Sequence, residues 1–325
     1  MLRNVDADET QRLLDYPGLI DALDAMYRAG VNAVTRMVLH ETLPGQKQND
    51  WLILPAWQYG KNFGVKLVSV FPENQQRGLA SILGIYALFD GTSGTPLAVM
   101  DGAALTLRKT AANSALAARY LARKNVRRMA MLGAGALAPH LVMAHCNVRP
   151  SIEHLTIWNR SRDNAEAMAK RLAGEAATRH LAIAIADTAE AAVRDADIVS
   201  AATMSKQPVV LGDWLRPGTH LDLVGAFRPD MRETDDAALA RSRIFCDARF
   251  TAAAECGDLC EPLARGFIDD KDLTDLFQLA RRERPGRKTA DEITLFKSGG
   301  GGHEDLATAQ YLVSKTDHVS KPAQT

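Results

Sequence analysis

The stretch "RRMAMLGAGALAPHLVMAHC", residues 127–146, decides the fold of this 325-residue chain. It begins as an apolar strand, turns at Gly133 and Gly135, and continues with apolar residues at helical spacing, starting near Ala138. This G-x-G-x-x-A turn brings a helix N-terminus close to the place where a dinucleotide pyrophosphate binds. A tight turn that serves only helix and sheet packing is the alternative. The position between a strand and a helix favours a dinucleotide site.

Strands and helices alternate along the chain after this turn. The strand-like runs are "HLTIWN" (154–159), "LAIAIA" (181–186), "DIVSAAT" (197–203), "HLDLVGA" (220–226), "RIFCDA" (243–248) and "ITLFK" (293–297). Segments with helical spacing separate the runs at 154–159, 181–186 and 197–203 from one another. Alternating units with apolar strands are typical of a parallel sheet covered on both faces. The sequence therefore predicts an α/β fold with a Rossmann-type doubly wound parallel sheet.

A different pattern precedes the glycine-rich turn. In residues 14–30, Asp15 and Pro17 stand at the start of apolar residues with helical spacing, which predicts an amphipathic helix. Strand-like runs with short turns fill residues 51–101 and predict an antiparallel sheet. Because 325 residues exceed one small core, we expect two domains. The polar tail, residues 314–325, is expected to be disordered.

Charge and composition limit the classes of partner. Lys plus Arg equals Asp plus Glu at 39 each, so no bulk charge attracts nucleic acid or an anionic membrane. The chain starts with a charged segment, and no apolar run approaches the roughly 20 residues of a membrane span. We therefore expect a cytoplasmic protein without nucleic-acid or membrane partners. The spacing of its four cysteines does not match a zinc site, and no metal is expected.

The end of the second parallel strand bears on the choice of dinucleotide. A carboxylate at this position accepts hydrogen bonds from the ribose 2′-hydroxyl of NAD, but this chain has "IWNRS", residues 157–161. Arg160 offers a planar guanidinium suited to a 2′-phosphate, with Asn159 and Ser161 as neutral partners. We expect NADPH to be preferred, with NADH possible. In the alternative, Arg160 is a solvated loop residue.

Two stretches place cations in unusual surroundings. In residues 63–71, strand alternation puts Lys66 on the same face as valines. Such a lysine lies either at a sheet edge with its ammonium group in water, which is the commoner situation, or buried beside an anion. In residues 105–114, Arg108 and Lys109 stand at an expected helix start, where positive charge is unfavourable unless an anion neutralises it. A ligand anion is one explanation, and two solvated side chains are the other.

Several motifs together resemble the ornithine cyclodeaminase and mu-crystallin family, in the family's order and over nearly the whole chain. They are "FGVKLVSVFPEN", "LTLRKTAANSALAARYLA", "LGAGALA", "WNRS", "GTHLDLVGAFRPDMRETDD" and "ITLFKSGGGG". The resemblance implies a Rossmann dinucleotide-binding domain at residues 119–295. It also implies a second α+β domain for substrate binding and dimerisation, formed by both chain ends, residues 1–118 with 296–325. A homodimer that binds NAD(H) or NADP(H) follows from the same resemblance.

The resemblance further implies a site for a small imino or amino acid. The family holds the substrate carboxylate with residues that fall on Arg36, Lys66, and Lys109 with Thr110. Lysine at position 109 departs from the family pattern L-T-x-x-R-T, and Arg108 lies one position early. Lys66 is also the expected catalytic residue, as a proton donor to the substrate nitrogen. The expected cofactor contacts are Gly133, Ala134, Gly135, Ala136, Leu137, Asn159, Arg160, Ser161, Thr203, Gly225 and Ser298.

Two missing carboxylates separate this chain from the cyclodeaminases. The position of an aspartate that handles the amino groups of ornithine holds Phe227, and an expected glutamate is Leu52. We therefore expect an NAD(P)H-dependent reductase of pyrroline-2-carboxylate or piperideine-2-carboxylate, giving proline or pipecolate. The alternatives are an ornithine cyclodeaminase, an amino-acid dehydrogenase or acyclic imine reductase, and a non-catalytic NADPH-dependent binder of small ligands.

Overall fold

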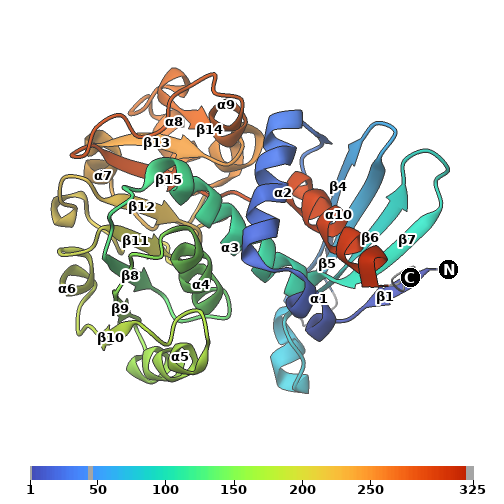
Figure 1. Cartoon of the computed structure of the whole chain (residues 1–325), viewed down its shortest axis with the longest axis horizontal. Coiled ribbons are helices and arrows are strands. Elements are labelled where there is room, and N and C mark those ends of the chain that lie inside the picture. The colour runs from blue at the N-terminus through green and yellow to red at the C-terminus, as the bar shows by residue number, and fades with distance from the viewer. Residues whose placement is uncertain (1, 43–46, 320–325) are drawn as a thin grey trace, which may run out of the picture. The chain divides into compact units, whose positions relative to one another are not determined.

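The computed structural model describes residues 2–42 and 47–319, which form two compact units (Figure 1). Unit 1 contains Met1–Lys109 and Gly301–Thr325, and unit 2 contains Thr110–Gly300. The domain boundaries expected from the sequence are 118/119 and 295/296. The first boundary falls inside helix α3 (Gly102–Leu121), where a continuous helix offers no sequence signal for a division.

Unit 2 is built on an eight-stranded sheet in which every neighbouring pair is parallel. The strand order is β10-β9-β8-β11-β12-β15-β13-β14. The strands are β8 (Arg128–Leu132), β9 (His154–Trp158), β10 (Ala182–Ile185), β11 (Ile198–Ala201), β12 (His220–Leu223), β13 (Ser242–Cys246), β14 (Thr274–Asp275) and β15 (Ile293–Lys297). All residues of β11, β12 and β15 are buried, as a sheet covered on both faces requires. The expected Rossmann-type sheet is confirmed.

Helices connect the parallel strands of unit 2. They are α4 (Ala138–Val148), α5 (Arg162–Gly174), α6 (Ala189–Val193), α7 (Asp236–Arg241), α8 (Gly257–Ala264) and α9 (Leu276–Ala280), and the later part of α3 precedes β8. Short helical turns lie at Gly212–Trp214, Arg249–Ala253 and Asp270–Asp272. The order of strands reverses between β8 and β11, and ligands of such sheets bind at the strand carboxyl ends beside this reversal.

Unit 1 is built on a seven-stranded sheet of order β1-β7-β6-β5-β4-β2, with β3 also paired to β4. Only β1 and β7 are parallel, so the expected antiparallel sheet is confirmed. The strands are β1 (Arg3–Val5), β2 (Asn32–Ala33), β3 (Met37–Glu41), β4 (Asn49–Gln58), β5 (Asn62–Val70), β6 (Ile82–Asp90) and β7 (Pro96–Asp101), and a short 3-10 helix lies at Pro72–Arg77.

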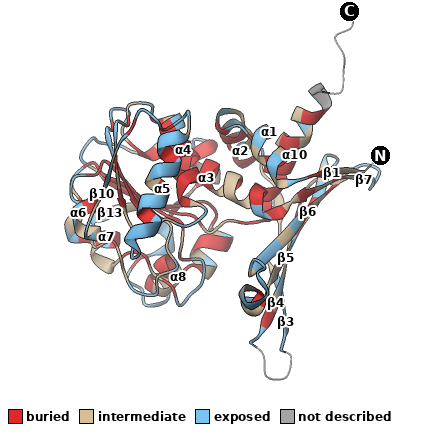
Figure 2. Cartoon of the chain, turned by 90° about the horizontal axis from the view of Figure 1, so that it is seen from below, coloured by how far each residue is buried: buried red, intermediate tan, exposed pale blue. Residues whose placement is uncertain are grey.

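The helices of unit 1 come from both ends of the chain. Helix α1 (Ala7–Leu13) is followed by α2 (Tyr16–Ala29), whose cap Asp15 accepts a hydrogen bond from the Gly18 backbone N–H, as the sequence predicted. Helix α10 (Gly302–Val319) packs against α2 and one face of strands β4 to β6 (Figure 2). The helix continues to Val319, so the expected disorder from residue 314 is wrong up to that point. Residues 320–325 lie outside the described residues.

None of the helices in the two described ranges is both long enough and apolar enough to cross a membrane.

Candidate active site

Lys66 lies in the interior of the antiparallel sheet of unit 1. Its strand β5 pairs with β4 and β6, and Lys66 stands opposite Leu54 and Tyr86. Its side chain is 8% exposed, and its Nζ lies 2.8 Å from Oδ2 of Asp305 in α10. The expected sheet-edge position with the ammonium group in water is therefore wrong. Lys66 is buried beside an anion, and that anion is a carboxylate of the same chain.

Lys109 is the second cation that the structure brings to this place. Its side chain is 3% exposed, and its Nζ lies 2.7 Å from Oε2 of Glu304 and 3.8 Å from Oδ1 of Asp305. Helix α3 begins at Gly102, so the expectation of a helix start at Arg108 and Lys109 is also wrong. The cations stand in the second turn, and a neighbouring carboxylate rather than the helix end sets the environment of Lys109.

Arg108 makes different contacts from Lys109. Its guanidinium donates a hydrogen bond of 2.8 Å to the Gln11 carbonyl oxygen and lies 4.9 Å from the ring centre of Tyr16. Successive residues of a helix point about 100° apart, so two neighbours do not reach the same group. Lys109 rather than Arg108 therefore shares the surroundings of Lys66.

We call Lys66, Lys109, Glu304 and Asp305 the ion cluster. Its two ammonium groups and two carboxylates balance in charge. The Tyr27 hydroxyl donates a hydrogen bond of 3.1 Å to Oε1 of Glu304, and it lies 3.4 Å from Nε2 of the fully buried His303. Burial lowers the pKa of His303 to about 4, so this ring is neutral at neutral pH and adds no charge.

The members of the ion cluster perturb each other's protonation. Burial lowers the pKa of Lys66, and the Asp305 carboxylate acts in the opposite direction. Burial alone raises the pKa of Glu304, but the Lys109 ammonium group holds that pKa below its ordinary value. Lys66 and Lys109 together lower the pKa of Asp305 in the same way against burial. A buried lysine whose pKa is lowered is suited to giving up a proton.

The other two expected substrate contacts are Arg36 and Thr110. Arg36 is partly buried in the connection between β2 and β3. Thr110 follows Lys109 in α3, is partly buried, and is the first residue of unit 2. Through Asp305 the structure joins Lys66 to Lys109, whereas the roles of Arg36 and Thr110 stay predictions.

The glycine-rich turn of unit 2 joins β8 to α4. Gly133 has a φ of 102°, and a Cβ there would lie 2.6 Å from the Ala202 carbonyl oxygen, so this position requires glycine. A Cβ at Gly135 would meet nothing within 4 Å. Packing therefore does not require glycine at that position, and the open space fits the close approach of a pyrophosphate to the backbone. The Ala134 N–H donates to Oδ1 of Asn159 at 3.1 Å.

A buried carboxylate shapes the backbone after β11 and β12. Glu233 accepts hydrogen bonds from the Thr203 N–H at 2.6 Å, from the Thr203 hydroxyl at 2.9 Å and from the Gly225 N–H at 2.6 Å. A Cβ at Gly225 would lie 1.9 Å from the Thr203 carbonyl oxygen, so glycine is required there. Burial raises the pKa of Glu233 to about 7. Glu233 thus holds two expected cofactor contacts in place.

A second carboxylate does the same after β15. Asp247 accepts hydrogen bonds from the Gly299 and Gly300 N–H groups at 2.7 and 2.6 Å. The hydroxyl of Ser298, another expected cofactor contact, donates to the same oxygen at 3.5 Å. These loops follow neighbouring parallel strands, where ligands of doubly wound sheets bind.

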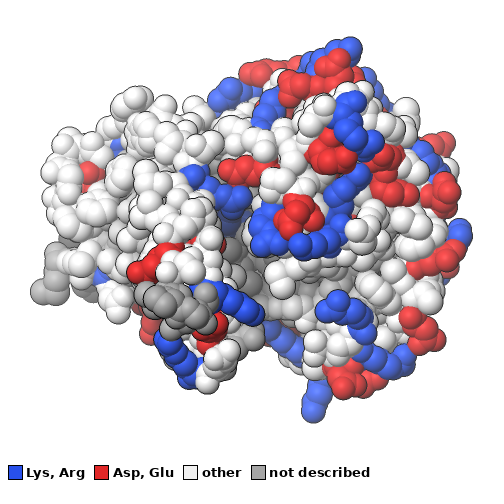
Figure 3. All heavy atoms as spheres, turned by 180° about the vertical axis from the view of Figure 1, so that it is seen from behind, with Lys and Arg blue, Asp and Glu red and all other residues white. Residues whose placement is uncertain are grey.

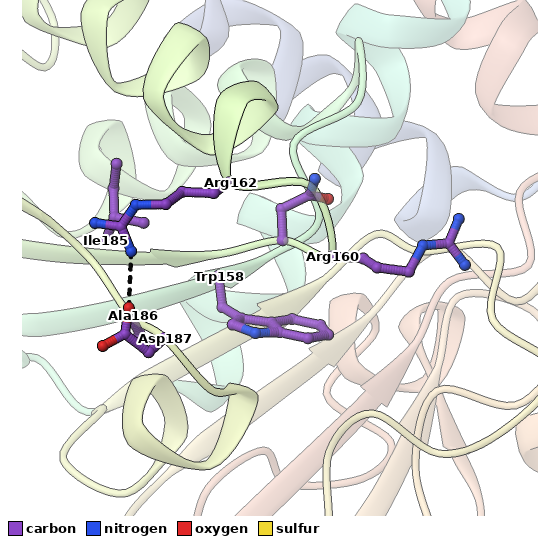
Figure 4. A pocket seen from close by; sticks show the side chains of 7 residues that line it. Trp158, Arg160, Arg162, Ile185, Ala186 and Asp187 are labelled. Atoms are coloured by element: carbon purple, nitrogen blue, oxygen red, sulfur yellow. Dashed lines mark hydrogen bonds and ion pairs between the residues drawn. The ribbon is translucent and has the colours of Figure 1, made fainter.

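A cavity of about 340 Å³ lies at the ends of β9 and β10. It is lined by Trp158, Asn159, Arg160, Arg162, Ile185, Ala186 and Asp187. Figure 4 shows the Arg162 side chain paired with Asp187, at 2.7 Å, whereas the exposed Arg160 points away from this pair.

The two expected neutral partners of Arg160 have other hydrogen bonds. Asn159 accepts the bond from Ala134, and the Ser161 hydroxyl accepts one from the Asn164 N–H at 3.4 Å as the cap of α5. Arg160 forms no ion pair or hydrogen bond with another described residue. Arg160 is therefore the group at this cavity that stays available to an anion.

The sequence did not predict a role for Glu304 and Asp305 in unit 1, nor for Glu233 and Asp247 in unit 2. "GGHED", residues 301–305, places two acids in the first turn of a helix after a glycine run, which is a usable signal for Glu304 and Asp305. Tyr27 and Glu233 carry no comparable signal, because each stands in an ordinary local pattern and reaches its partners only in the folded chain.

The model of the Ornithine cyclodeaminase/mu-crystallin family matches residues 2–319, and the chain belongs to this family. The Delta(1)-pyrroline-2-carboxylate reductase of Paracoccus denitrificans (strain Pd 1222) is 41% identical over 293 residues, covering 90% of this chain and 91% of that protein. The ketimine reductase mu-crystallin of Rattus norvegicus is 30% identical over 319 residues, covering 95% of each.

A solved structure extends this similarity to the fold. The Delta(1)-pyrroline-2-carboxylate reductase of Thermococcus litoralis, in complex with NADH and L-proline, matches with a TM-score of 0.89. The sequence identity is 29%, and the match covers 100% of both chains. The fold of this chain is therefore that of a nicotinamide-dependent enzyme of this family.

Lys109 and Glu304 allow a direct test of the ion cluster. Lys109→Met leaves the Glu304 charge buried without its nearest cation, so we expect the free energy of unfolding to fall by about 3 to 5 kcal/mol. Glu304→Gln leaves the Lys109 charge buried without its nearest anion. The double variant recovers much of the loss, because neither charge is then left alone. Urea denaturation of the three variants measures these differences.

Lys271→Met is the matched control, because it breaks the exposed pair of Lys271 with Asp269. We expect it to leave stability unchanged. Purely additive losses in the double variant would show that Lys109 and Glu304 do not depend on each other.

Proposed function

We propose that this protein is an NAD(P)H-dependent reductase of a small cyclic imino acid, pyrroline-2-carboxylate or piperideine-2-carboxylate, which it converts into proline or pipecolate. The buried lysine pair, Lys66 and Lys109, carries the proposal. An ammonium group has three N–H donors, so Lys66 retains donors beyond the one directed at Asp305. The names of the Paracoccus and Thermococcus relatives support the same substrate class.

The proposed reaction needs a hydride at the imine carbon and a proton at the imine nitrogen. Bound NAD(P)H supplies the hydride. Arg36, Lys66, Lys109 and Thr110 hold the substrate carboxylate, which fixes the plane of the ring. Such positioning supplies much of the rate of a hydride transfer. Lys66 donates the proton, a role that its buried surroundings favour.

The dinucleotide is proposed to bind at the carboxyl edge of the parallel sheet. Residues Gly133, Ala134, Gly135, Ala136 and Leu137 hold its pyrophosphate, because the turn combines a required positive φ with open space beside Gly135. The loops at Thr203, Gly225 and Ser298 contact its nicotinamide half. Asn159, Arg160 and Ser161 flank the adenosine ribose, where Arg160 favours the 2′-phosphate of NADPH.

Ornithine cyclodeamination is the second candidate, and two side chains disfavour it. Leu52 in β4 and Phe227 after β12 supply no carboxylate where the cyclodeaminases have one. Glu304 and Asp305, the two acids of the described part of unit 1 that are 0% exposed, are paired with lysines. No carboxylate is therefore assigned to accept a proton from a diamine substrate.

A substrate panel tests the proposed function. We expect NADPH absorbance to fall when pyrroline-2-carboxylate or piperideine-2-carboxylate is added, with proline or pipecolate as product. Ornithine with catalytic NAD⁺ is expected to give no proline. An acyclic imine formed from pyruvate and ammonia serves as the comparison for the dehydrogenase alternative. Proline formation from ornithine, or quenching of NADPH fluorescence without turnover, contradicts the proposal.

Arg160 tests the cofactor preference. Arg160→Ala removes the available guanidinium at the cavity, so we expect NADPH binding to weaken by about 1 to 3 kcal/mol, the range for a charge-assisted hydrogen bond. NADH binding should change little, because NADH lacks the 2′-phosphate. Titrations of both cofactors measure this. Arg171→Ala, on the exposed side of α5, is the control. Equal losses for both cofactors would refute the assignment.

We also propose a homodimer formed through unit 1. The sheet face opposite α10 carries apolar side chains that are 38 to 56% exposed. They are Met37, Leu39, Trp51, Phe63, Leu67, Leu83 and Ile85. Register places them on one face, since directly opposed residues of antiparallel strands share a side. Few charged side chains interrupt this part of the surface in Figure 3.

A second copy of the chain fits this apolar face better than a charged partner does. An isologous dimer places the same face against itself, which needs no charge complementarity. Contiguous apolar surface of this kind marks an interaction site.

Lysine substitutions test the dimer. Leu67→Lys with Ile85→Lys places two charges in the proposed interface, where burying them is costly. We expect light scattering to give twice 35.3 kDa for the unmodified protein and 35.3 kDa for the variant. Phe267→Lys, at another exposed apolar side chain in unit 2, should leave the dimer intact. A monomeric unmodified protein would disprove this interface.

A further inference from the structure

Asp305 occupies a special place in the ion cluster. Its carboxylate lies 2.8 Å from the Nζ of Lys66 and 3.8 Å from the Nζ of Lys109, so it contacts both cations. Glu304, the preceding residue, pairs with Lys109 and accepts the hydrogen bond from Tyr27. Both acids are fully buried in the first turn of α10. The adjacent acids therefore have different partners and can have different roles.

We propose that Asp305 is a positioning residue that holds Lys66 as the proton donor to the substrate's imine nitrogen, whereas Glu304 holds Lys109 for the substrate's carboxylate. This inference rests on the proposed function. Lys66 contacts the carboxylate there and also donates the proton, and the inference ties this second role to Asp305. Neither acid touches the reacting atoms; each acts through its lysine.

The position of Lys66 explains why it needs such a partner. A lysine side chain has a flexible four-carbon stem, so its ammonium group has no fixed direction of its own. Here the side chain is buried, with Leu54 and Tyr86 as cross-strand neighbours, and the ammonium group is anchored on Asp305. One N–H bond directed at Asp305 fixes the cone in which the other two N–H bonds point. Asp305 thus converts a flexible cation into an oriented donor.

Among the groups around Lys66, Asp305 does most to keep Lys66 protonated. The titratable and charged groups that face it are Asp305, Glu304 and His303 on α10, Lys109 on α3 and Tyr86 on β6; β4 contributes the apolar Leu54. Burial and Lys109 lower the pKa of Lys66, whereas Asp305 and Glu304 raise it. Asp305 has the larger effect of the two acids because it is in direct contact. Without Asp305, Lys66 would lose its proton at a lower pH.

The proposed step conserves atoms and electrons. The imine carbon would receive a hydride, with its electron pair, from bound NAD(P)H, and the C=N π electrons move to nitrogen. Nitrogen takes a proton from the Nζ of Lys66, which becomes a neutral amine and later regains a proton from water. The imine is reduced by two electrons and the cofactor is oxidised by two. Activity therefore falls as pH rises through the pKa of Lys66.

The test is the pH profile of kcat with pyrroline-2-carboxylate and saturating NADPH. Asp305→Asn keeps the shape of the side chain but removes its charge, so we expect the alkaline limb to move to lower pH. We also expect kcat at neutral pH to fall by about tenfold, with a smaller change in KM. This is less than the roughly 10²- to 10⁴-fold of a complete general-acid contribution, because Lys66 itself stays in place. Asp305→Glu should return the alkaline limb toward its original position.

Glu304→Gln is the comparison at the neighbouring acid. Because it loosens Lys109, we expect KM to rise more than kcat falls, with the alkaline limb close to its original pH. Tyr86→Phe removes the hydroxyl of a buried side chain that stands opposite Lys66 in the sheet, and it leaves every charge of the ion cluster in place. It should leave the profile unchanged.

Lys66→Arg gives a second measurement if Asp305→Asn does not fold. The guanidinium keeps the ion pair but stays charged at all accessible pH, so kcat should fall and the alkaline limb should disappear. A limb that survives in Lys66→Arg, or one that Asp305→Asn leaves in place while kcat and KM change equally, overturns the inference alone. An unmodified protein that reduces no cyclic imino acid overturns the proposed function and the inference with it.

Discussion

The neutral ion cluster in unit 1 is the constraint on which the rest of that unit depends. Burial of a single ammonium or carboxylate group costs several kcal/mol, and two of each are tolerated only because they neutralise one another at short distance. The lysines come from β5 and α3, and the acids come from α10, close to the opposite end of the chain. The need to pair these charges therefore brings the C-terminal helix onto the N-terminal sheet.

Unit 2 uses buried carboxylates for a related purpose, with backbone groups as partners. Glu233 and Asp247 accept hydrogen bonds from N–H groups of loops that follow neighbouring strands. A loop that must approach a ligand closely has few partners of its own for these N–H groups. An internal carboxylate satisfies them and at the same time fixes the loop. In both units, acids for which the sequence predicted no role fix the positions of the site residues that it did predict.

Most features that depend on residues close in sequence were predicted correctly, whereas features that depend on distant residues were not. The glycine turn, the parallel strands and the cap of α2 depend on residues close in sequence, and each was predicted from its local pattern. The environment of Lys66 depends on Asp305, which is distant in sequence, and strand alternation alone favoured a sheet edge instead. The start of α3 was placed six residues late for a different reason: the cap was overlooked. Asp101 directly precedes the helix and accepts a hydrogen bond of 2.7 Å from the Ala104 N–H.

The pairing of the lysines also changes how a substrate carboxylate is bound. The anion does not meet two bare cations, because Glu304 and Asp305 already neutralise them. Its binding then depends on N–H donors in fixed directions more than on net charge. Binding of this kind gains little from long-range attraction but is sensitive to the orientation of the ring. Interactions that hold the reacting geometry contribute to the rate, whereas strong uniform attraction to the ground state does not. A charge-balanced pocket therefore suits an enzyme that must orient a small, planar imino acid rather than retain it tightly.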